Sequence, residues 1–430
     1  MRTLEIFRLL SCKPCLIGRI SPNESIFEYD ASYLESPDAQ PLSLSLPLRQ
    51  EPFKEAHFKP YFEGLIAEGA ARRTLAAELQ TSESDYLSIL ELCGRECIGD
   101  IVVHEEGQPF VGVPESYEAL SKSEFKALFK NDCEMANENI ASRLSLAGTQ
   151  NKIGLAHLPS AAMDEGRFRP QGFAGTTHIL KTSHLLDVPE LEYLCMKTAA
   201  QLGIPTAKVA LLDFGKPVLV VERFDRIVRN TERNMQVTRL HQEDLAQALG
   251  ITPGSKYVEL SGSTVSCIAE LLKQESAQPA RDVISFAQQI CFSYLIGNCD
   301  AHLKNFSIVY HEGRGKGKGK PRTSLAPAYD FVSTTYFPRF SRDMAFALGG
   351  ERDIDVISPD NFHALALQLG ISESSLRNLA KPLVNEIVPA LQKAGNGQMG
   401  AVLESTPYIA DRLEEDLQPR LDVLRSFCGV

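Results

Sequence analysis

The stretch that decides the fold lies in the second half of the chain and reads Gly297-Asn298-Cys299-Asp300-Ala301-His302-Leu303-Lys304-Asn305-Phe306-Ser307. A helix predicted over 281–296 ends at Gly297, and a strand is predicted over 306–310, so the polar residues between them form a loop. Asp300 and Asn305 stand five residues apart in this loop. The base and a metal ligand have the same separation in the catalytic loop of protein kinases.

The chemistry of phosphoryl transfer gives this spacing a physical reason. A hard divalent cation takes oxygen ligands, and the transfer needs the base and the metal on the same side of the γ-phosphate. The loop therefore predicts Asp300 as the catalytic base and Asn305 as a magnesium ligand. We expect His302 to fix the loop by hydrogen bonding, with proton transfer as the alternative role, and Lys304 to steady the γ-phosphate. The alternative is that Asp300 and Asn305 only shape a turn.

A second acidic residue follows at the end of another predicted strand, over 325–329. Asp330 and Phe331 resemble the start of the D-F-G element of kinases, with Val332 in place of the glycine. If the strands before and after 311–321 pair in antiparallel fashion, Asn305 and Asp330 lie close together. The two side chains then predict a magnesium clamp.

Three upstream stretches supply the other parts of a nucleotide site. Lys181 ends the predicted strand 177–181, where a lysine is expected to meet nucleotide phosphates, although lysines also end strands without such a role. The stretch from Glu222 to Phe224 ends the strand 218–222 and is expected to bind adenine, with Phe224 covering the base. A surface network of Arg and Asp side chains is the alternative there. The small and hydroxyl residues of 143–152 suit a loop whose N–H groups approach phosphate.

Size and charge bound the class of protein. A chain of 430 residues suggests two or three domains, and we expect boundaries that give 1–110, 111–225 and 226–430. The formal charge is 44 − 55 = −11, which disfavours binding DNA without a basic partner. No apolar run approaches the roughly 20 residues of a membrane span, and the charged start does not resemble a signal peptide. We therefore expect a cytoplasmic protein with no membrane contact.

A cysteine pair and a Gly/Lys-rich insertion each have two possible interpretations. Cys12 and Cys15 form one CxxC pair, which we interpret as separate reduced thiols, with a metal or redox role as the alternative. The Gly/Lys-rich insertion 311–321 is interpreted as a solvated hairpin tip, with a contact to nucleic acid or to an acidic partner as the alternative.

The remaining pattern predicts further elements. The alternating run 41–48 predicts a half-buried edge strand, and 98–103 predicts another strand. Helices are expected over 58–79, near 115–130 and over 189–202, and the segment 359–430 is expected to be mostly helical. The fold class is therefore α+β.

Taken together, the chain resembles the HipA family of bacterial serine/threonine kinases, the toxins of HipA–HipB toxin–antitoxin modules. The resemblance runs in order along nearly the whole chain, through 145–150, 178–181, 221–226, 242–244, 300–307 and 328–330. It implies a two-lobed fold related to protein kinases and phosphatidylinositol kinases, with a mixed α/β N-terminal lobe and a mostly helical C-terminal lobe.

The resemblance also implies roles for single residues, with ATP and Mg²⁺ as cofactors. Asp300 would be the catalytic base, and Asn305 and Asp330 would hold magnesium. Ser145 would be the site of autophosphorylation. The ATP-binding residues would be Lys181, Glu222, Phe224, Ala147, Gly148, Thr149, Gln150, His302 and Lys304.

The family resemblance further implies partners. Known family substrates are aminoacyl-tRNA synthetases, and the usual partner is a HipB-like helix-turn-helix antitoxin that binds operator DNA. The alternatives are a small-molecule or lipid kinase on the same scaffold, or a catalytically silent co-repressor. The sequence does not name the protein substrate, the phosphorylation state of Ser145 or the oligomeric state.

Overall fold

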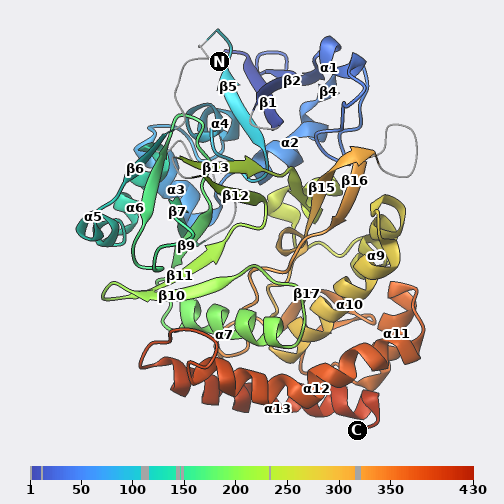
Figure 1. The fold of residues 1–430 in the computed structure, drawn as a ribbon. Coiled ribbons are helices and arrows are strands. Elements are labelled where there is room, and N and C mark those ends of the chain that lie inside the picture. The colour runs from blue at the N-terminus through green and yellow to red at the C-terminus, as the bar shows by residue number, and fades with distance from the viewer. Residues whose placement is uncertain are drawn as a thin grey trace. The chain divides into compact units, whose positions relative to one another are not determined.

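The computed structural model describes residues 2–10, 13–107, 116–141, 146, 150–231, 234–314 and 321–430. Two compact units are built from segments that alternate along the chain (Figure 1). Unit 1 comprises 1–183, 214–253 and 309–321, and unit 2 comprises 184–213, 254–308 and 322–430.

The N-terminal part of unit 1 is an antiparallel sheet in the order β4-β3-β2-β1-β5. Its strands are β1 (Leu4–Leu10), β2 (Lys13–Ser21), β3 (Ile26–Tyr29), β4 (Phe53–Lys54) and β5 (Ile101–Glu105). Its helices are α1 (Ala31–Glu35), α2 (Glu55–Gly64), α3 (Gly69–Glu78) and α4 (Tyr86–Cys93). Phe27 packs its ring 5.6 Å from that of Phe62 and 6.1 Å from that of Phe53. These rings belong to a continuous apolar core that joins sheet and helices.

The second part of unit 1 contains five strands in the order β11-β9-β7-β8-β6. They are β6 (Ser116–Ala119), β7 (Asn151–His157), β8 (Arg167–Gln171), β9 (His178–Thr182) and β11 (Pro217–Glu222). The unit also contains α5 (Lys122–Ala127), α6 (Asp132–Ala141), β12 (Arg226–Thr231), β13 (Asn234–Arg239), β14 (Gln242–Asp244) and α8 (Leu245–Ala248). Strand β9 lies between β7 and β11, so its backbone is paired with a strand on both sides.

Unit 2 is mostly helical. Its helices are α7 (Val188–Gln201), α9 (Thr264–Glu275), α10 (Pro279–Leu295), α11 (Pro359–Leu369), α12 (Glu373–Gly395) and α13 (Thr406–Cys428). Its short elements are β10 (Val209–Asp213), η2 (Leu303–Asn305), β17 (Asp343–Leu348) and β18 (Glu351–Asp353). Three further elements have residues in both units: η1 (Pro253–Ser255), β15 (Ser307–Arg314) and β16 (Pro321–Leu325). Pro279 starts α10 at its first turn, and Val283, Phe286 and Ile290 are buried along one face.

Several predicted elements are confirmed, including the helices at 189–202 and 281–296 and the helical segment from 359 onward. The helix predicted over 58–79 is wrong as one element, because α2 and α3 are separate. The helix near 115–130 is preceded by strand β6 and begins only at Lys122. The strand predicted over 325–329 ends at Leu325, and beyond it only Ala328 forms an isolated bridge, to Thr206.

The edge strand predicted over 41–48 is wrong. The segment forms a turn closed by an isolated bridge between Ser43 and Leu46. The physical reason is that its serines are hydrogen-bonded rather than solvated. Ser43 Oγ donates to Glu243 Oε2 at 2.5 Å, and Ser45 Oγ donates to the Gln247 carbonyl at 2.7 Å. Polar side chains with specific partners override the alternation that favours a strand.

Among the residues that the structure describes, no helix has the length and apolar character needed to cross a bilayer.

Candidate active site

The loop that begins at Gly297 is fixed by the end of helix α10 and by a neighbouring segment of unit 2. Gly297 has φ of +70°, and a Cβ there would collide with the Thr335 hydroxyl, so only glycine fits. The Gly297 carbonyl accepts hydrogen bonds from the backbone N–H groups of Thr334 at 2.9 Å and Thr335 at 3.1 Å. The first end of the loop is therefore tied to residues that follow Asp330.

Within the loop, Asp300 and Asn305 are linked directly. The Asn305 side-chain Nδ2 donates to the Asp300 carbonyl at 2.8 Å. The backbone N–H of His302 donates to the same carbonyl at 2.8 Å, and the N–H of Asn305 donates to the His302 carbonyl at 2.9 Å. Because the amide nitrogen of Asn305 is used inside the loop, its Oδ1 is oriented away from that bond and is the atom suited to a cation.

The second end of the loop is tied to the segment that precedes Asp330. The Ala326 N–H donates to the Ser307 carbonyl at 2.8 Å. Tyr329 Oη donates to the Lys304 carbonyl at 2.9 Å and lies 2.6 Å from Ser307 Oγ. Segments 297–307 and 326–335 are thus hydrogen-bonded on both sides of Asp330, which brings the two predicted metal-binding segments side by side within unit 2.

The donor atoms of these segments fit a magnesium ion. In the described part of the chain, no group of three or more His, Cys, Asp or Glu side chains forms a ready metal site. An amide from Asn305 and a carboxylate from Asp330 are both hard oxygen ligands. Magnesium in nucleotide enzymes commonly takes only one or two protein ligands and fills the rest with phosphate oxygens and water.

His302 and Lys304 are both buried, at 6% and 7% exposure. The His302 ring meets the ring of Tyr257 edge-on, with centroids 5.1 Å apart. The backbone groups of both residues help to hold the loop, as His302 bonds Asp300 and the Lys304 carbonyl accepts from Tyr329. The roles predicted for their side chains stay predictions.

Unit 1 carries most of the residues predicted to bind ATP, whereas His302 and Lys304 belong to unit 2. Lys181 is 5% exposed on the central strand β9, with Lys152 of β7 and Leu219 of β11 as its neighbours. Glu222 ends β11 opposite His178. The next residue continues the pairing, since the Arg223 N–H donates to the Thr177 carbonyl at 2.9 Å.

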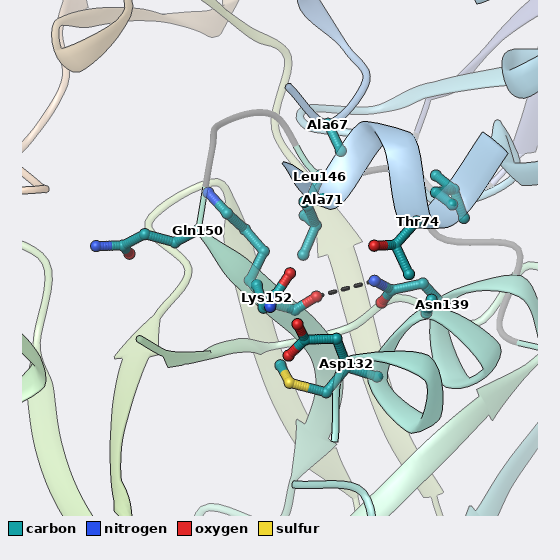
Figure 2. A pocket seen from close by; sticks show the side chains of 12 residues that line it. Ala67, Ala71, Thr74, Asp132, Asn139, Leu146, Gln150 and Lys152 are labelled. Atoms are coloured by element: carbon teal, nitrogen blue, oxygen red, sulfur yellow. Dashed lines mark hydrogen bonds between the residues drawn. The ribbon is translucent and has the colours of Figure 1, made fainter. Parts of the chain in front are cut away.

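Of residues 145–150 in the predicted phosphate loop, the structure describes only Leu146 and Gln150, because Ser145, Ala147, Gly148 and Thr149 lie outside the described residues. Leu146 is buried, and with Gln150 it lines a small pocket formed by α3, α6 and the start of β7 (Figure 2). The pocket wall includes Asn139, whose Nδ2 donates to the Lys152 carbonyl at 2.9 Å (Figure 2). The apolar side chain of Leu146 is therefore buried beside the start of strand β7.

A buried ionic cluster behind Glu222 and Phe224 is a feature that the sequence did not reveal. Glu222 and Phe224 are half-buried, whereas Arg223 and Asp225 are buried. Arg223 donates to Asp225 at 2.8 and 2.9 Å and to Glu96 at 3.1 Å. The proposed surface network of Arg and Asp is thus an interior one.

Glu96 is the centre of this cluster. Its carboxylate accepts from Arg226 at 2.9 Å, pairs with Arg239, and accepts from the Thr176 hydroxyl at 2.8 Å. Burial alone would raise the pKa of Glu96, but the guanidinium groups of Arg239, Arg226 and Arg223 outweigh it and hold the pKa to about 2. Glu96 lies about 80 to 140 residues from these partners in sequence, so no local pattern could have identified it.

Comparisons with known proteins identify the family to which this fold and the Asp300–Asn305 loop belong. The family model of the HipA N-terminal domain matches residues 12–104, and that of the HipA-like C-terminal domain matches residues 144–391. The chain therefore belongs to the HipA family.

Individual relatives agree with this assignment. Y4mE of Sinorhizobium fredii, a protein named as a candidate kinase, is 31% identical over 85% of this chain and 86% of that protein. The serine/threonine-protein kinase toxin HipA of Shewanella oneidensis is 31% identical over 54% of this chain and 53% of the toxin.

The fold is also that of a solved structure. A HipA of Shewanella oneidensis, solved in complex with HipB and its operator DNA, matches with a TM-score of 0.79 at 22% identity and covers 99% of both chains. This likeness confirms the predicted α+β kinase-like fold class.

Proposed function

We propose that this chain is an ATP-dependent serine/threonine protein kinase that acts as the growth-inhibiting toxin of a toxin–antitoxin module. The observation that carries the proposal is the double attachment of segment 297–307 to segment 326–335. It joins Asp300 and Asn305 to Asp330 in one hydrogen-bonded substructure. Membership of a family with members named as kinases supports the same activity.

In this proposal each residue has a definite task. Asp300 orients the acceptor hydroxyl and takes its proton as the oxygen attacks. Lys181 binds the α- and β-phosphates, while Glu222 and Phe224 hold adenine. Asn305 and Asp330 would hold magnesium, which would supply positive charge beside the transferring phosphoryl group.

The regulatory site and the substrate are proposed by analogy with other members of the family. Ser145, next to the buried Leu146, is proposed as the residue that the kinase phosphorylates on itself. Ala147, Gly148, Thr149 and Gln150 are proposed to contact the phosphates, and His302 and Lys304 are also proposed as ATP-binding residues. An aminoacyl-tRNA synthetase is the proposed protein substrate.

A small helix-turn-helix antitoxin is the proposed partner, in the cytoplasm. The Shewanella oneidensis HipA was solved with HipB and operator DNA. The formal charge of −11 fits a chain that reaches DNA only through a basic partner.

The test is phosphate transfer to the protein itself. Purified wild type incubated with ATP and magnesium is expected to gain phosphate at Ser145, detected by intact mass and peptide mapping. Asp300→Asn is expected to lower the rate at least about 100-fold, the scale of losing a positioned general base. Asp360→Asn, on an exposed position in the first turn of α11, is the matched control and keeps the wild-type rate. Equal labelling of Asp300→Asn and the control would contradict the proposal.

A further inference from the structure

The hydroxyl of Tyr257 is hydrogen-bonded to Asp300, the proposed catalytic base. Tyr257 Oη donates to Asp300 Oδ1 at 2.5 Å. Tyr257 belongs to the connection between η1 and α9, and 44% of the residue is exposed. A protein substrate must present its acceptor hydroxyl to the base in the same way, as a hydrogen-bond donor.

The backbone around Tyr257 is fixed while its side chain is accessible. The Glu259 carboxylate accepts from the Thr264 N–H at 2.7 Å and from the Ala347 N–H at 2.8 Å, which ties the connection to α9 and β17. The Val258 N–H donates to the Ser255 carbonyl at 2.9 Å. A change of side-chain rotamer is therefore enough to move the Tyr257 hydroxyl away from Asp300.

The ring of Tyr257 also borders the site. Its edge-on contact with His302 has centroids 5.1 Å apart at 75°, and Lys256 Nζ lies 5.5 Å from its centroid. Val258, the next residue, is 48% exposed. Tyr257 and Val258 thus present an apolar surface beside the one carboxylate that must receive the acceptor's proton.

We propose that Tyr257 marks the acceptor subsite, and that its hydroxyl occupies the place of the substrate hydroxyl until a serine or threonine of the substrate displaces it. This inference rests on the proposed kinase function. In the transfer, the acceptor oxygen bonds to the γ-phosphorus, the bond from that phosphorus to the bridging oxygen breaks, ADP leaves and the acceptor proton passes to Asp300. With Tyr257 in place, water is excluded from the base and ATP is protected from hydrolysis.

The probe for this subsite is ATP hydrolysis, with water as the acceptor. Tyr257→Phe keeps the ring and its contacts and removes only the hydroxyl. In this variant the hydrogen bond from Tyr257 to the charged Asp300 carboxylate is gone, so water no longer competes with it for the base. Phosphate release is therefore expected to rise about fivefold or more. ATP affinity, measured by calorimetry, is expected to stay unchanged. Tyr408→Phe, at an exposed tyrosine of α13, is the matched control.

The outcomes separate this inference from the kinase proposal. If wild type transfers phosphate, Asp300→Asn does not, and Tyr257→Phe releases phosphate no faster than the control, the subsite is overturned and the kinase stands. Slower release from Tyr257→Phe overturns it too, because the hydroxyl would then be holding the base. Phosphate found on Tyr257 itself overturns displacement, since the tyrosine would be the acceptor. Wild type without any transfer overturns both.

Discussion

The proposed metal ligand Asp330 has an unusual backbone. Its φ is +56°, a region that non-glycine residues enter at a cost of about 1 kcal/mol or more. The hydrogen bonds of Tyr329 before it and of Thr334 after it hold this conformation. Such a fixed and strained backbone is typical of residues whose side chain must point in one direction.

A second residue with unusual surroundings is Glu243, which lies in the interior of unit 1. Its carboxylate accepts hydrogen bonds from Ser43 Oγ, Tyr310 Oη and the Leu44 N–H. Burial nevertheless raises its pKa from 4.5 to about 7, because these three donors offset the loss of water only in part. Between about pH 4.5 and pH 7, the Glu243 carboxyl group therefore holds a proton in the folded protein that it releases in the unfolded chain.

This proton predicts a pH dependence of stability. A raised pKa stabilises the fold at low pH, and the contribution is lost as pH rises through about 7. Between about pH 5 and pH 8, the free energy of unfolding of wild type is expected to fall by up to about 3 kcal/mol relative to Glu243→Gln. Urea unfolding over this range measures it, with the exposed Glu118→Gln as control. Parallel curves for wild type and Glu243→Gln would contradict the assignment.

At the scale of elements, the Glu96 cluster connects the N-terminal sheet to the end of β11. Glu96 follows α4, and Arg223 follows β11, where adenine is proposed to bind. Arg226 and Arg239, paired with each other at the open end of the β12–β13 hairpin, bind the same carboxylate. The cluster fixes the backbone on which Glu222 and Phe224 stand.

Removing the central charge is expected to be costly. Glu96→Gln leaves buried guanidinium groups without full compensation, so the free energy of unfolding is expected to fall by about 3 kcal/mol. ATP affinity is expected to fall with it. In Glu118→Gln, an exposed partner of Arg169 is lost, and a change below about 1 kcal/mol is expected. Denaturant unfolding compares them, and equal losses would show that the cluster is not a structural centre.

The elements also show what local sequence can predict. The loop from Gly297 to Asn305 was predicted in its form, because a helix end, a polar spacing and a following strand are all local signals. Segment 41–48 was predicted wrongly because its hydroxyls bind Glu243 and Gln247, about 200 residues away. Local sequence does not identify Tyr257 or Glu96 for the same reason, because their partners are distant in sequence.

For the chain as a whole, the order of several weak motifs predicts the family, and two family models confirm it. The compact units could not be predicted in the same way. Each consists of three separate segments, and unit 1 includes 309–321 between two segments of unit 2. Composition along a chain does not reveal such alternation, and the boundaries near 110 and 225 stay predictions.

The proposed kinase chemistry requires that Asn305 and Asp330 hold one nucleotide-bound metal next to Asp300. A crystal structure of the full chain with ATP and magnesium tests it most directly. We expect a magnesium ion at about 2.1 Å from Asn305 Oδ1 and from an Asp330 carboxylate oxygen, with phosphate oxygens among its other ligands. Magnesium and ATP bound elsewhere, with neither side chain in the coordination sphere, would contradict it.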